Sequence, residues 1–519
     1  MSRDKGILER RPVWKGAVGM VWPWLAAAVI VWWAEAVAVL AAEHRRPERA
    51  AAWLLVLLAL PIVGILPFLL SRGKAGAGDD GPDARGTGVA GANGSGSGGG
   101  EGVGGAAAGR PGRGEGGGNA GDPMPARRSV AANDDFSGDG RLGRALRAIA
   151  KAPITGCNGV EILTDGEAAF REMFAMIDKA EHHIHAAFYI LREDGVGRRF
   201  RDALIRKARE GVQVRLIYDG IGSRKLRRAY LRELEAAGVR ARCFLPPGAA
   251  LLSRRINHRY HRKIIVVDGK SGFTGGINIG DEYLGMDRKL GCWRDTHLKL
   301  EGDAVYDLQN AFVRDWKLAS GETLDDPAYW PPHACTSRER MQIVSCGPHP
   351  GGDEIHDSLL AAIGAARERV WIETPYFVPD EGLKSALRMA ALGGVDVRLI
   401  VPGVSDSRLV QAATLSHAAD LEEAGVKVYR YRKGFIHAKV MIVDRLLASV
   451  GTANLDMRSF YSNYELNALL FDGKPIGRLE EDFRQDLADS REATAEELRG
   501  TSAGARAGRA LARLLSPLL

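Results

Sequence analysis

The sequence has 519 residues, a formal net charge of +7 and a hydrophobic content of 45%. This length is too great for one ordinary hydrophobic core, so several folded units are expected. The basic excess favours an anionic partner, either phospholipid headgroups or nucleic acid, and composition does not choose between them. The five cysteines form no C-x-x-C pair and no Cys/His cluster at zinc spacing, which predicts free thiols in a reducing compartment and no metal site.

Two apolar runs near the N-terminus are each long enough to cross a bilayer. They cover about 13–42 and 50–70, and a helix needs ~20 residues to cross ~30 Å of hydrocarbon. Residues 1–71 are therefore predicted to form a transmembrane hairpin. A cleaved signal peptide fits less well, because the first run is too long and no small-residue cleavage site follows it. Lysine and arginine flank the hairpin more densely than they occupy its loop, which predicts a multi-pass protein of the cytoplasmic (inner) membrane with both ends in the cytoplasm.

Residues 72–135 consist mainly of glycine, alanine, serine and isolated charges. Such a composition cannot bury a core, so we predict a flexible linker. Beyond it, helical patterns alternate with short β-branched strands, and the order occurs twice. This predicts an α/β fold with a largely buried sheet, duplicated as domains 136–335 and 336–495. The basic tail, 496–519, fits either an amphipathic segment on the inner leaflet or an ordinary closing helix of the second domain.

The repeats match segment by segment. A helix at 166–180 followed by a strand at 181–190 corresponds to a helix at 355–368 followed by a strand at 369–377. The strand at 211–218 corresponds to the strand at 394–401. The sequence Leu-Glu-x-Ala-Gly-Val then occurs in both repeats, at 234–239 and 421–426.

Each repeat next carries the same His-Lys-Asp pattern, in which a histidine is followed by a lysine two residues later and an aspartate five residues after that. The residues are His261, Lys263 and Asp268 in the first repeat and His437, Lys439 and Asp444 in the second. Apolar runs at 264–267 and 440–443 predict a strand within each pattern. Residues two apart in a strand share a face, so each histidine and lysine should point the same way. A lysine neutralises phosphate oxygens and a histidine moves protons or attacks phosphorus, so the pair indicates phosphoryl chemistry. The aspartates end their strands, where an acid commonly caps a turn, and a direct catalytic role is least supported for them.

Glycines and asparagines follow each copy of the pattern. We expect Gly275 and Gly451 to let the backbone approach a phosphate and Asn278 and Asn454 to donate hydrogen bonds to it. If the copies meet, one histidine can form a covalent phosphohistidine while the other protonates the leaving alkoxide and then deprotonates the acceptor. The lysines would supply the charge that metal ions supply elsewhere, so no cofactor is expected. The cluster His182, His183 and His185 is predicted to be a packed or hydrogen-bonded strand rather than a ligand set.

These stretches resemble the phospholipase D superfamily and, within it, the bacterial cardiolipin synthase family. The most specific segments are HRKIIVVD, GGINIGDEYLG and WRDTHLKLEG in the first repeat, and HAKVMIVD and GTANLDMRSFYSNYELN in the second. The resemblance implies two sandwich-like α/β domains with the active site at their interface. It also implies a metal-independent transfer, in which one phosphatidylglycerol gives its phosphatidyl group to a histidine, releasing glycerol, and a second accepts it to form cardiolipin.

The same resemblance assigns residue roles. It makes His261 the nucleophile and His437 the acid and base, although the sequence itself is symmetric between them. Downstream acids orient the histidines in the family, and Asp295 and Glu465 occupy the matching places. The long Gly-rich linker departs from the family pattern.

Other functions remain open at the level of sequence. A phospholipase D-type phosphodiesterase would use the same chemistry to hydrolyse phospholipid or nucleic acid. A nucleic-acid enzyme gains little from integral anchoring, so phosphatidylglycerol and other anionic phospholipids are the expected partners, and nucleic acid is not. A third alternative is a catalytically inactive scaffold that binds lipid. The presence of two intact His-Lys-Asp patterns argues against it. The second phospholipid substrate and the oligomeric state are not determined by the sequence.

Overall fold

The computed structural model describes residues 27–37, 53–54, 56–58, 140–246, 258–349 and 351–518. Residues 27–37, 53–54 and 56–58 are helical, and the remainder of the predicted hairpin and the predicted linker lie outside the described residues. Within the part of the chain that is described, no helix has both the length and the apolar character needed to cross a membrane.

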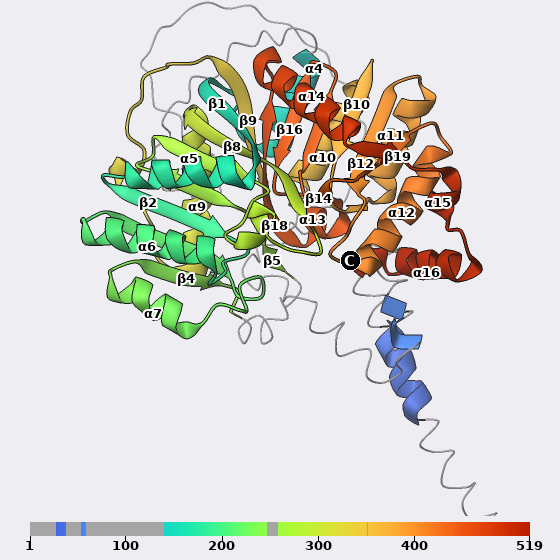
Figure 1. The fold of residues 1–519 in the computed structure, drawn as a ribbon, viewed down its shortest axis with the longest axis horizontal. Coiled ribbons are helices and arrows are strands. Elements are labelled where there is room, and N and C mark those ends of the chain that lie inside the picture. The colour runs from blue at the N-terminus through green and yellow to red at the C-terminus, as the bar shows by residue number, and fades with distance from the viewer. Residues whose placement is uncertain are drawn as a thin grey trace, which may run out of the picture. The chain divides into compact units, whose positions relative to one another are not determined.

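Two repeats of similar element order make up residues 140–518 (Figure 1). After α4 (Gly140–Ala150), the first repeat comprises β1 (Thr155–Asp165), α5 (Gly166–Asp178), β2 (His183–Phe188), α6 (Gly195–Arg209), β3 (Gln213–Asp219), α7 (Arg228–Ala236), β4 (Arg240–Phe244), β5 (Arg259–Tyr260), β6 (Ile264–Val267), β7 (Ser271–Gly275), η1 (Asp281–Leu284), β8 (Cys292–Gly302), α9 (Asp303–Ser320) and η2 (Pro327–Tyr329).

The second repeat comprises β9 (Glu339–Cys346), α10 (Glu354–Ala365), β10 (Arg369–Glu373), β11 (Phe377–Val378), α11 (Glu381–Leu392), β12 (Asp396–Pro402), α12 (Arg408–Glu422), β13 (Lys427–Tyr431), β14 (Gly434–Ile436), β15 (Val440–Val443), β16 (Leu447–Gly451), β17 (Leu455–Asp456), α13 (Met457–Tyr461), β18 (Asn463–Leu470), α14 (Gly473–Ala488), β19 (Ser490–Glu492), α15 (Ala495–Arg499), α16 (Ala503–Leu514) and η3 (Ser516–Leu518). The predicted duplicated α/β architecture is therefore present.

The strands of the two repeats pair into one mixed sheet with matching halves. The first repeat has the order β4-β3-β2-β6-β7-β8-β1. The second has the order β13-β12-β10-β15-β16-β18-β9, and β1 pairs with β9 where the halves meet. In each half three strands run parallel and the others antiparallel, so β2 corresponds to β10, β6 to β15 and β8 to β18.

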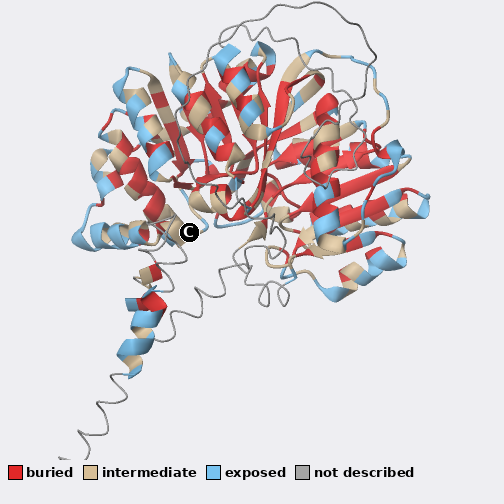
Figure 2. Ribbon diagram, turned by 180° about the vertical axis from the view of Figure 1, so that it is seen from behind, coloured by how far each residue is buried: buried red, intermediate tan, exposed pale blue. Residues whose placement is uncertain are grey.

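Helices cover both faces of this sheet, which is why its strands are almost continuously apolar. In β2, Ile184, Ala186 and Phe188 join a core cluster with α5 and α6. His185 points the other way, and its ring stacks on Phe312 of α9 with centroids 4.6 Å apart. The second repeat is built alike, with α14 in the place of α9. Buried residues accordingly follow the strands and the inward helix faces in Figure 2.

Both ends of the region 140–518 pack on the second repeat. Leu142 and Leu146 of α4 belong to the core cluster of that repeat, although they fall within the predicted first domain, 136–335. At the other end, α16 lies against α12, where Arg513 donates to Asp420 at 2.9 and 2.6 Å. This is the closing-helix arrangement, and it leaves Leu511 and Leu514 exposed.

One pair of cysteines departs from the expectation of free thiols. Cys157 in β1 and Cys335, in the segment 330–338 that connects the repeats, form a disulfide across 178 residues. The prediction is wrong for this pair because the fold, and not the sequence spacing, brings the sulfur atoms together. Cys243, Cys292 and Cys346 are free.

Candidate active site

Each histidine of the His-Lys-Asp pattern follows a short strand that pairs with the opposite repeat. Strand β5 runs parallel to β18, and the His261 amide donates to the Tyr464 carbonyl at 3.0 Å. Strand β14 runs parallel to β8, and the His437 amide donates to the Arg294 carbonyl at 2.7 Å. The strands predicted at 264–267 and 440–443 are confirmed as β6 and β15. The histidines and lysines lie just before these strands, in segments that belong to no helix or strand. The short strands β5 and β14 lie at the junction of the repeats (Figure 1).

This crossed pairing places each histidine beside an acid of the other repeat. His261 Nδ1 lies 2.9 Å from Glu465 Oε2, and His437 Nδ1 lies 2.7 Å from Asp295 Oδ2. Both carboxylates are completely buried. The family resemblance predicted the two acids as partners of the histidines. That each acid belongs to the repeat opposite its histidine follows only from the strand pairing.

Further polar groups hold the two carboxylates, and sequence analysis missed them. The Thr452 hydroxyl donates to Glu465 Oε2 at 2.6 Å, and the Asn463 amide donates to Oε1 at 3.0 Å. Asp295 accepts from its neighbour's backbone, Thr296 N, at 2.9 Å, and from Trp293 Nε1 at 3.3 Å. Each acid is therefore fixed before it meets a histidine, which restricts the histidine to one ring orientation.

Burial sets the charge of the histidines. It lowers the pKa of His261 to about 4, although the nearby Glu465 carboxylate opposes the change. The pKa of His437 is lowered to about 4 by burial and by Lys439, against the effect of Asp295. Both rings are then neutral near pH 7. A neutral ring that donates through Nδ1 to a carboxylate keeps an unprotonated Nε2, which is the atom a nucleophile needs.

The two lysines are buried ammonium groups. Lys263 Nζ donates to the His261 carbonyl at 2.6 Å, and Lys439 Nζ donates to the His437 carbonyl at 2.5 Å. Burial lowers the pKa of Lys263 to about 7 and that of Lys439 to about 8, although the two site carboxylates favour the charged forms. An added phosphate charge would favour the protonated lysines further.

A cavity of about 370 Å³ opens between the repeats, and both histidines line it. Its wall also contains Arg259 of β5 and Arg458 of α13, so each repeat contributes a cation. Neither lysine is part of the wall. The other lining residues are Tyr189, Ile190, Asn278, Tyr283, Trp293, Tyr376, Val378, Asp406, Ser407, Val410, Asn454, Asp456 and Asn463.

The aspartates of the pattern lie away from this cavity. Asp268 accepts from three successive backbone amides before and in β2, at 2.8 to 2.9 Å, and Asp444 does the same before β10, at 2.7 to 3.0 Å. Both adopt a left-handed backbone, with φ of 55° and 51°. Their geometry is that of turn residues that fix the start of a neighbouring strand, and neither carboxylate bonds to His261 or His437.

The glycines and asparagines after each pattern differ from the expectation. A Cβ at Gly275 would meet His297 Cα and the Thr296 carbonyl at 2.6 Å, and one at Gly451 would meet Asn467 Oδ1 at 2.2 Å. These glycines thus admit a neighbouring strand and do not line the cavity.

Asn278 and Asn454 do line the cavity, but their side chains are engaged within the protein. Asn278 accepts from Ile190 N at 3.1 Å and donates to the Tyr283 hydroxyl at 2.7 Å. Asn454 donates to Asp456 at 3.2 Å.

The cluster of histidines in and before β2 lies elsewhere, as predicted. His183 and His185 are fully buried, and both rings contact Tyr329. His185 also lies within hydrogen-bond distance of Gln309. In the part of the chain that the structure describes, a single group of three side chains could hold a metal ion, namely Cys157, Asp303 and His333, and none of them lines the cavity.

Known proteins are similar to this chain in sequence and in fold. The family model described as cardiolipin synthase, PLD-like domain, matches residues 173–316 and 359–487. A cardiolipin synthase of Geobacillus kaustophilus is 39% identical over 491 residues, which are 93% of this chain and 91% of that protein. Cardiolipin synthase 2 of Bacillus anthracis is 46% identical over 359 residues, 69% of this chain and 70% of that protein.

Among solved structures, the phosphatidylserine synthase of Haemophilus influenzae is similar with a TM-score of 0.59 and 15% identity. The similarity covers 73% of this chain and 100% of that one, and at this identity it supports the fold alone. The sequence matches extend over both repeats and include both His-Lys-Asp patterns. The chain therefore belongs to the cardiolipin synthase family of phospholipase D-like proteins.

Proposed function

We propose that the protein is a cardiolipin synthase that transfers a phosphatidyl group from one phosphatidylglycerol to another and releases glycerol. The observation that carries the proposal is the crossed pair of histidines, each held by an acid of the opposite repeat at the wall of one cavity. The names of the relatives, which match over most of their length, support the choice of substrate.

In the first step, Nε2 of neutral His261 attacks the phosphorus of one phosphatidylglycerol. A P–N bond forms, the P–O bond to glycerol breaks, and protonated His437 gives its proton to the departing glycerol oxygen. The negative charge of the bound phosphodiester raises the pKa of His437 above its value in the empty site, so that His437 carries this proton. The ammonium groups of Lys263 and Lys439 offset the charge of the phosphoryl group.

In the second step, the terminal hydroxyl of another phosphatidylglycerol attacks the phosphohistidine. His437, now neutral, accepts the hydroxyl proton, the P–N bond breaks, and cardiolipin leaves with His261 neutral again. Glu465 and Asp295 accept from the Nδ1 positions throughout and hold each ring with Nε2 available. Asp268 and Asp444 have structural roles, and Asn278 and Asn454 shape the cavity wall.

The proposal includes the membrane hairpin, with helices at about 13–42 and 50–70 and the catalytic repeats on the cytoplasmic side of the inner membrane. It is supported by the two apolar runs and by the distribution of lysine and arginine around them. An anchored enzyme meets its lipid substrates within the bilayer surface, so phosphatidylglycerol is reached without extraction into water.

The test is to incubate the purified full chain with phosphatidylglycerol alone in detergent micelles and to identify the products. Cardiolipin and glycerol in equal amounts are expected. Phosphatidic acid as the main product would show that the protein is a hydrolase and not a synthase. The absence of any product would contradict both activities.

Two variants test the roles of the histidines. His261→Ala should abolish turnover and leave no acid-labile phosphoryl adduct, because it removes the attacking nitrogen. His437→Asn should slow turnover by about 10³-fold or more, because it removes the proton donor and acceptor. Mass spectrometry of the intact protein would detect any adduct that forms and persists. Turnover of His261→Ala near the wild-type rate would contradict the assignment of the nucleophile.

A further inference from the structure

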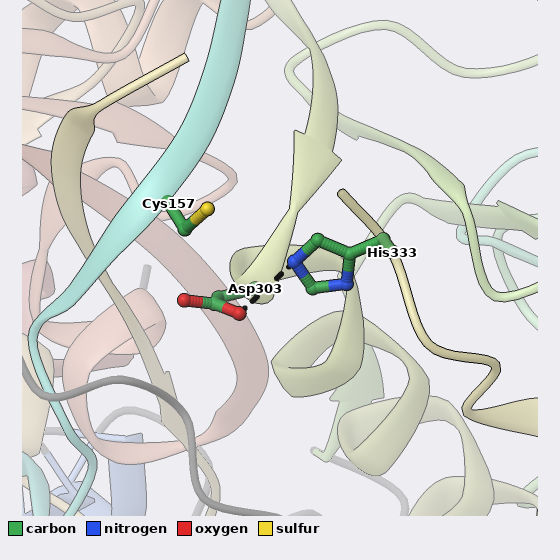
Figure 3. Close-up of side chains that lie close together, drawn as sticks. All are labelled: Cys157, Asp303 and His333. Carbon is green, nitrogen blue, oxygen red and sulfur yellow. Dashed lines mark ion pairs between the residues drawn. The ribbon is translucent and has the colours of Figure 1, made fainter. Parts of the chain in front are cut away.

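A second cluster of reactive side chains lies outside the cavity, where the connecting segment 330–338 meets the first repeat (Figure 3). Cys157 projects from β1, Asp303 is the first residue of α9, and His333 belongs to the connecting segment. One ligand atom of each, the sulfur, a carboxylate oxygen and a ring nitrogen, lies within 4.8 Å of the others. The cluster has no part in the transfer chemistry proposed above.

The hydrogen bonds of His333 determine which nitrogen faces the acid. The Tyr306 hydroxyl donates to the Pro331 carbonyl, so it accepts from His333 Nδ1, which lies 2.8 Å away. In a neutral ring Nε2 then carries the lone pair. This atom lies 3.1 Å from Asp303 Oδ1. A lone pair directed at a carboxylate oxygen is repulsive unless a cation, either a proton or a metal ion, lies between them.

Asp303 gives an independent indication of a missing cation. Its side chain is 7% exposed, and its second oxygen, Oδ2, is buried without a hydrogen-bond partner. A buried carboxylate oxygen that lacks a partner is costly. Two ligand atoms, each about 2.0 Å from a tetrahedral zinc ion, lie about 3.3 Å apart. The separation of 3.1 Å between Asp303 and His333 is close to that value.

A second cysteine adjoins this group of three. Cys335 is bonded to Cys157, so reduction of the disulfide frees the Cys157 thiol within the group and the Cys335 thiol on the adjoining segment. Two thiolates, one imidazole and one carboxylate suit Zn²⁺, and four protein ligands are typical of a structural site. Tyr306 would serve as the outer partner that holds His333 for coordination through Nε2.

We propose that the reduced cluster binds one Zn²⁺ through Cys157, Cys335, Asp303 and His333, and that the disulfide is its oxidised, metal-free form. A dithiol reductant supplies two electrons and two protons, which convert the disulfide into two thiols. Zn²⁺ then replaces the two thiol protons, which pass to the buffer. Oxidation by diamide takes two electrons and two protons from the thiols, reforms the S–S bond and releases the metal.

Either form ties the segment between the repeats to β1. Because β1 pairs with both β8 and β9, this attachment lies at the seam of the two halves of the sheet. In a reducing cytoplasm the thiol form would prevail, which rests on the membrane placement proposed above. Zinc binding by the reduced chain does not depend on that placement or on the transfer activity.

The test uses the purified full chain, treated with a dithiol and a chelator, desalted and then titrated with Zn²⁺ against a chromophoric competitor. We expect one tightly bound zinc ion per chain and release of that ion when diamide is added, with recovery after reduction. Co²⁺ in place of Zn²⁺ should give a thiolate-to-cobalt charge-transfer band. If the reduced chain binds no zinc, or if diamide does not release the bound zinc, the proposal is wrong. This test needs only the wild-type protein.

Variants locate the site. Cys157→Ser and His333→Ala should each lower zinc affinity by at least about 10-fold, whereas Cys243→Ser, at a free cysteine outside the cluster, should keep one zinc ion. Retention of tight binding in either cluster variant would overturn the assignment. Because the readout is metal content, failure of the proposed transferase activity would leave this result unaffected.

Discussion

At the scale of single residues, the site depends on neutral histidines beside charged lysines. Burial lowers the pKa of both kinds of group. Because the ordinary pKa of a lysine is much higher than that of a histidine, the pKa of His261 falls to about 4 and that of Lys263 only to about 7. Between these pH values His261, the proposed nucleophile, is unprotonated while Lys263 keeps its charge. Burial alone would raise the pKa of Glu465, but His261 and Lys263 lower it below its usual value, so this acid stays ionised in the same range.

This difference predicts the pH dependence of the reaction. The value of kcat/KM reports the free enzyme, in which the first step needs neutral His261 and protonated His437. It should therefore be greatest near pH 4 and fall on either side, with a further fall as pH rises through about 7, where Lys263 loses its proton. The alkaline limb of kcat should lie at higher pH, because the bound phosphodiester favours the ammonium form. Steady-state rates on phosphatidylglycerol across this range would test both statements. An alkaline limb at the same pH for kcat and kcat/KM would contradict the role of Lys263.

At the scale of elements, two very short strands do most of the positioning. Strand β5 has 2 residues and β14 has 3, and neither could be identified from a sequence pattern of that length. Each nevertheless pairs with a long strand of the opposite repeat and carries the following histidine to an acid there. The turn after β7 supports the same contact, because Gly276 packs directly on the Asp295 carboxylate.

Gly276→Ala should therefore impair catalysis through Asp295. A Cβ at this position would lie 1.9 Å from Asp295 Oδ1, so the carboxylate must move and His437 loses its partner. A displacement of this size should lower kcat by about 10²-fold. The control is Gly364→Ala in α10, where no atom lies within 4 Å of the new Cβ; it should leave kcat unchanged and stabilise the protein by roughly 0.5–1 kcal/mol. A Gly276→Ala variant with wild-type kcat would show that the position of Asp295 does not matter.

At the scale of the whole molecule, sequence analysis predicted what is local and repeated. The duplicated order of helices and strands and the strands β6 and β15 were accessible, because periodicity and matching segments reveal them. Asp295 and Glu465 were identified only through the resemblance to a known family. The exchange of acids between repeats was not accessible, since it joins residues 204 and 142 positions apart in the sequence. For the same reason the disulfide between Cys157 and Cys335, and the packing of α4 on the second repeat, could not be predicted.

The junction of the repeats contains a buried ion pair that should couple their stability. Arg262 donates to both oxygens of Asp315 at 2.6 Å, and also to the carbonyls of Glu465 at 3.0 Å and Cys346 at 2.8 Å in the second repeat. Sequence analysis passed over Arg262 because it lies between the two pattern residues. Arg262→Met would leave the Asp315 carboxylate buried without its cation, which costs about 3–5 kcal/mol of unfolding free energy.

The prediction is tested by denaturant unfolding of the reduced full chain. Arg262→Met should be the most destabilised variant, and the double variant Arg262→Met with Asp315→Leu should recover part of the loss, because no unpaired buried charge remains. The matched control is Arg478→Met, which removes an ion pair at 2.9 Å between the exposed Arg478 and the partly exposed Asp482 and should change the unfolding free energy by less than about 1 kcal/mol. The lost donors to Glu465 and Cys346 belong to the seam of the sheet, so kcat should fall together with stability in the single variant. A single variant as stable as Arg478→Met would mean that the repeats are held together by their apolar cores and strand pairing alone.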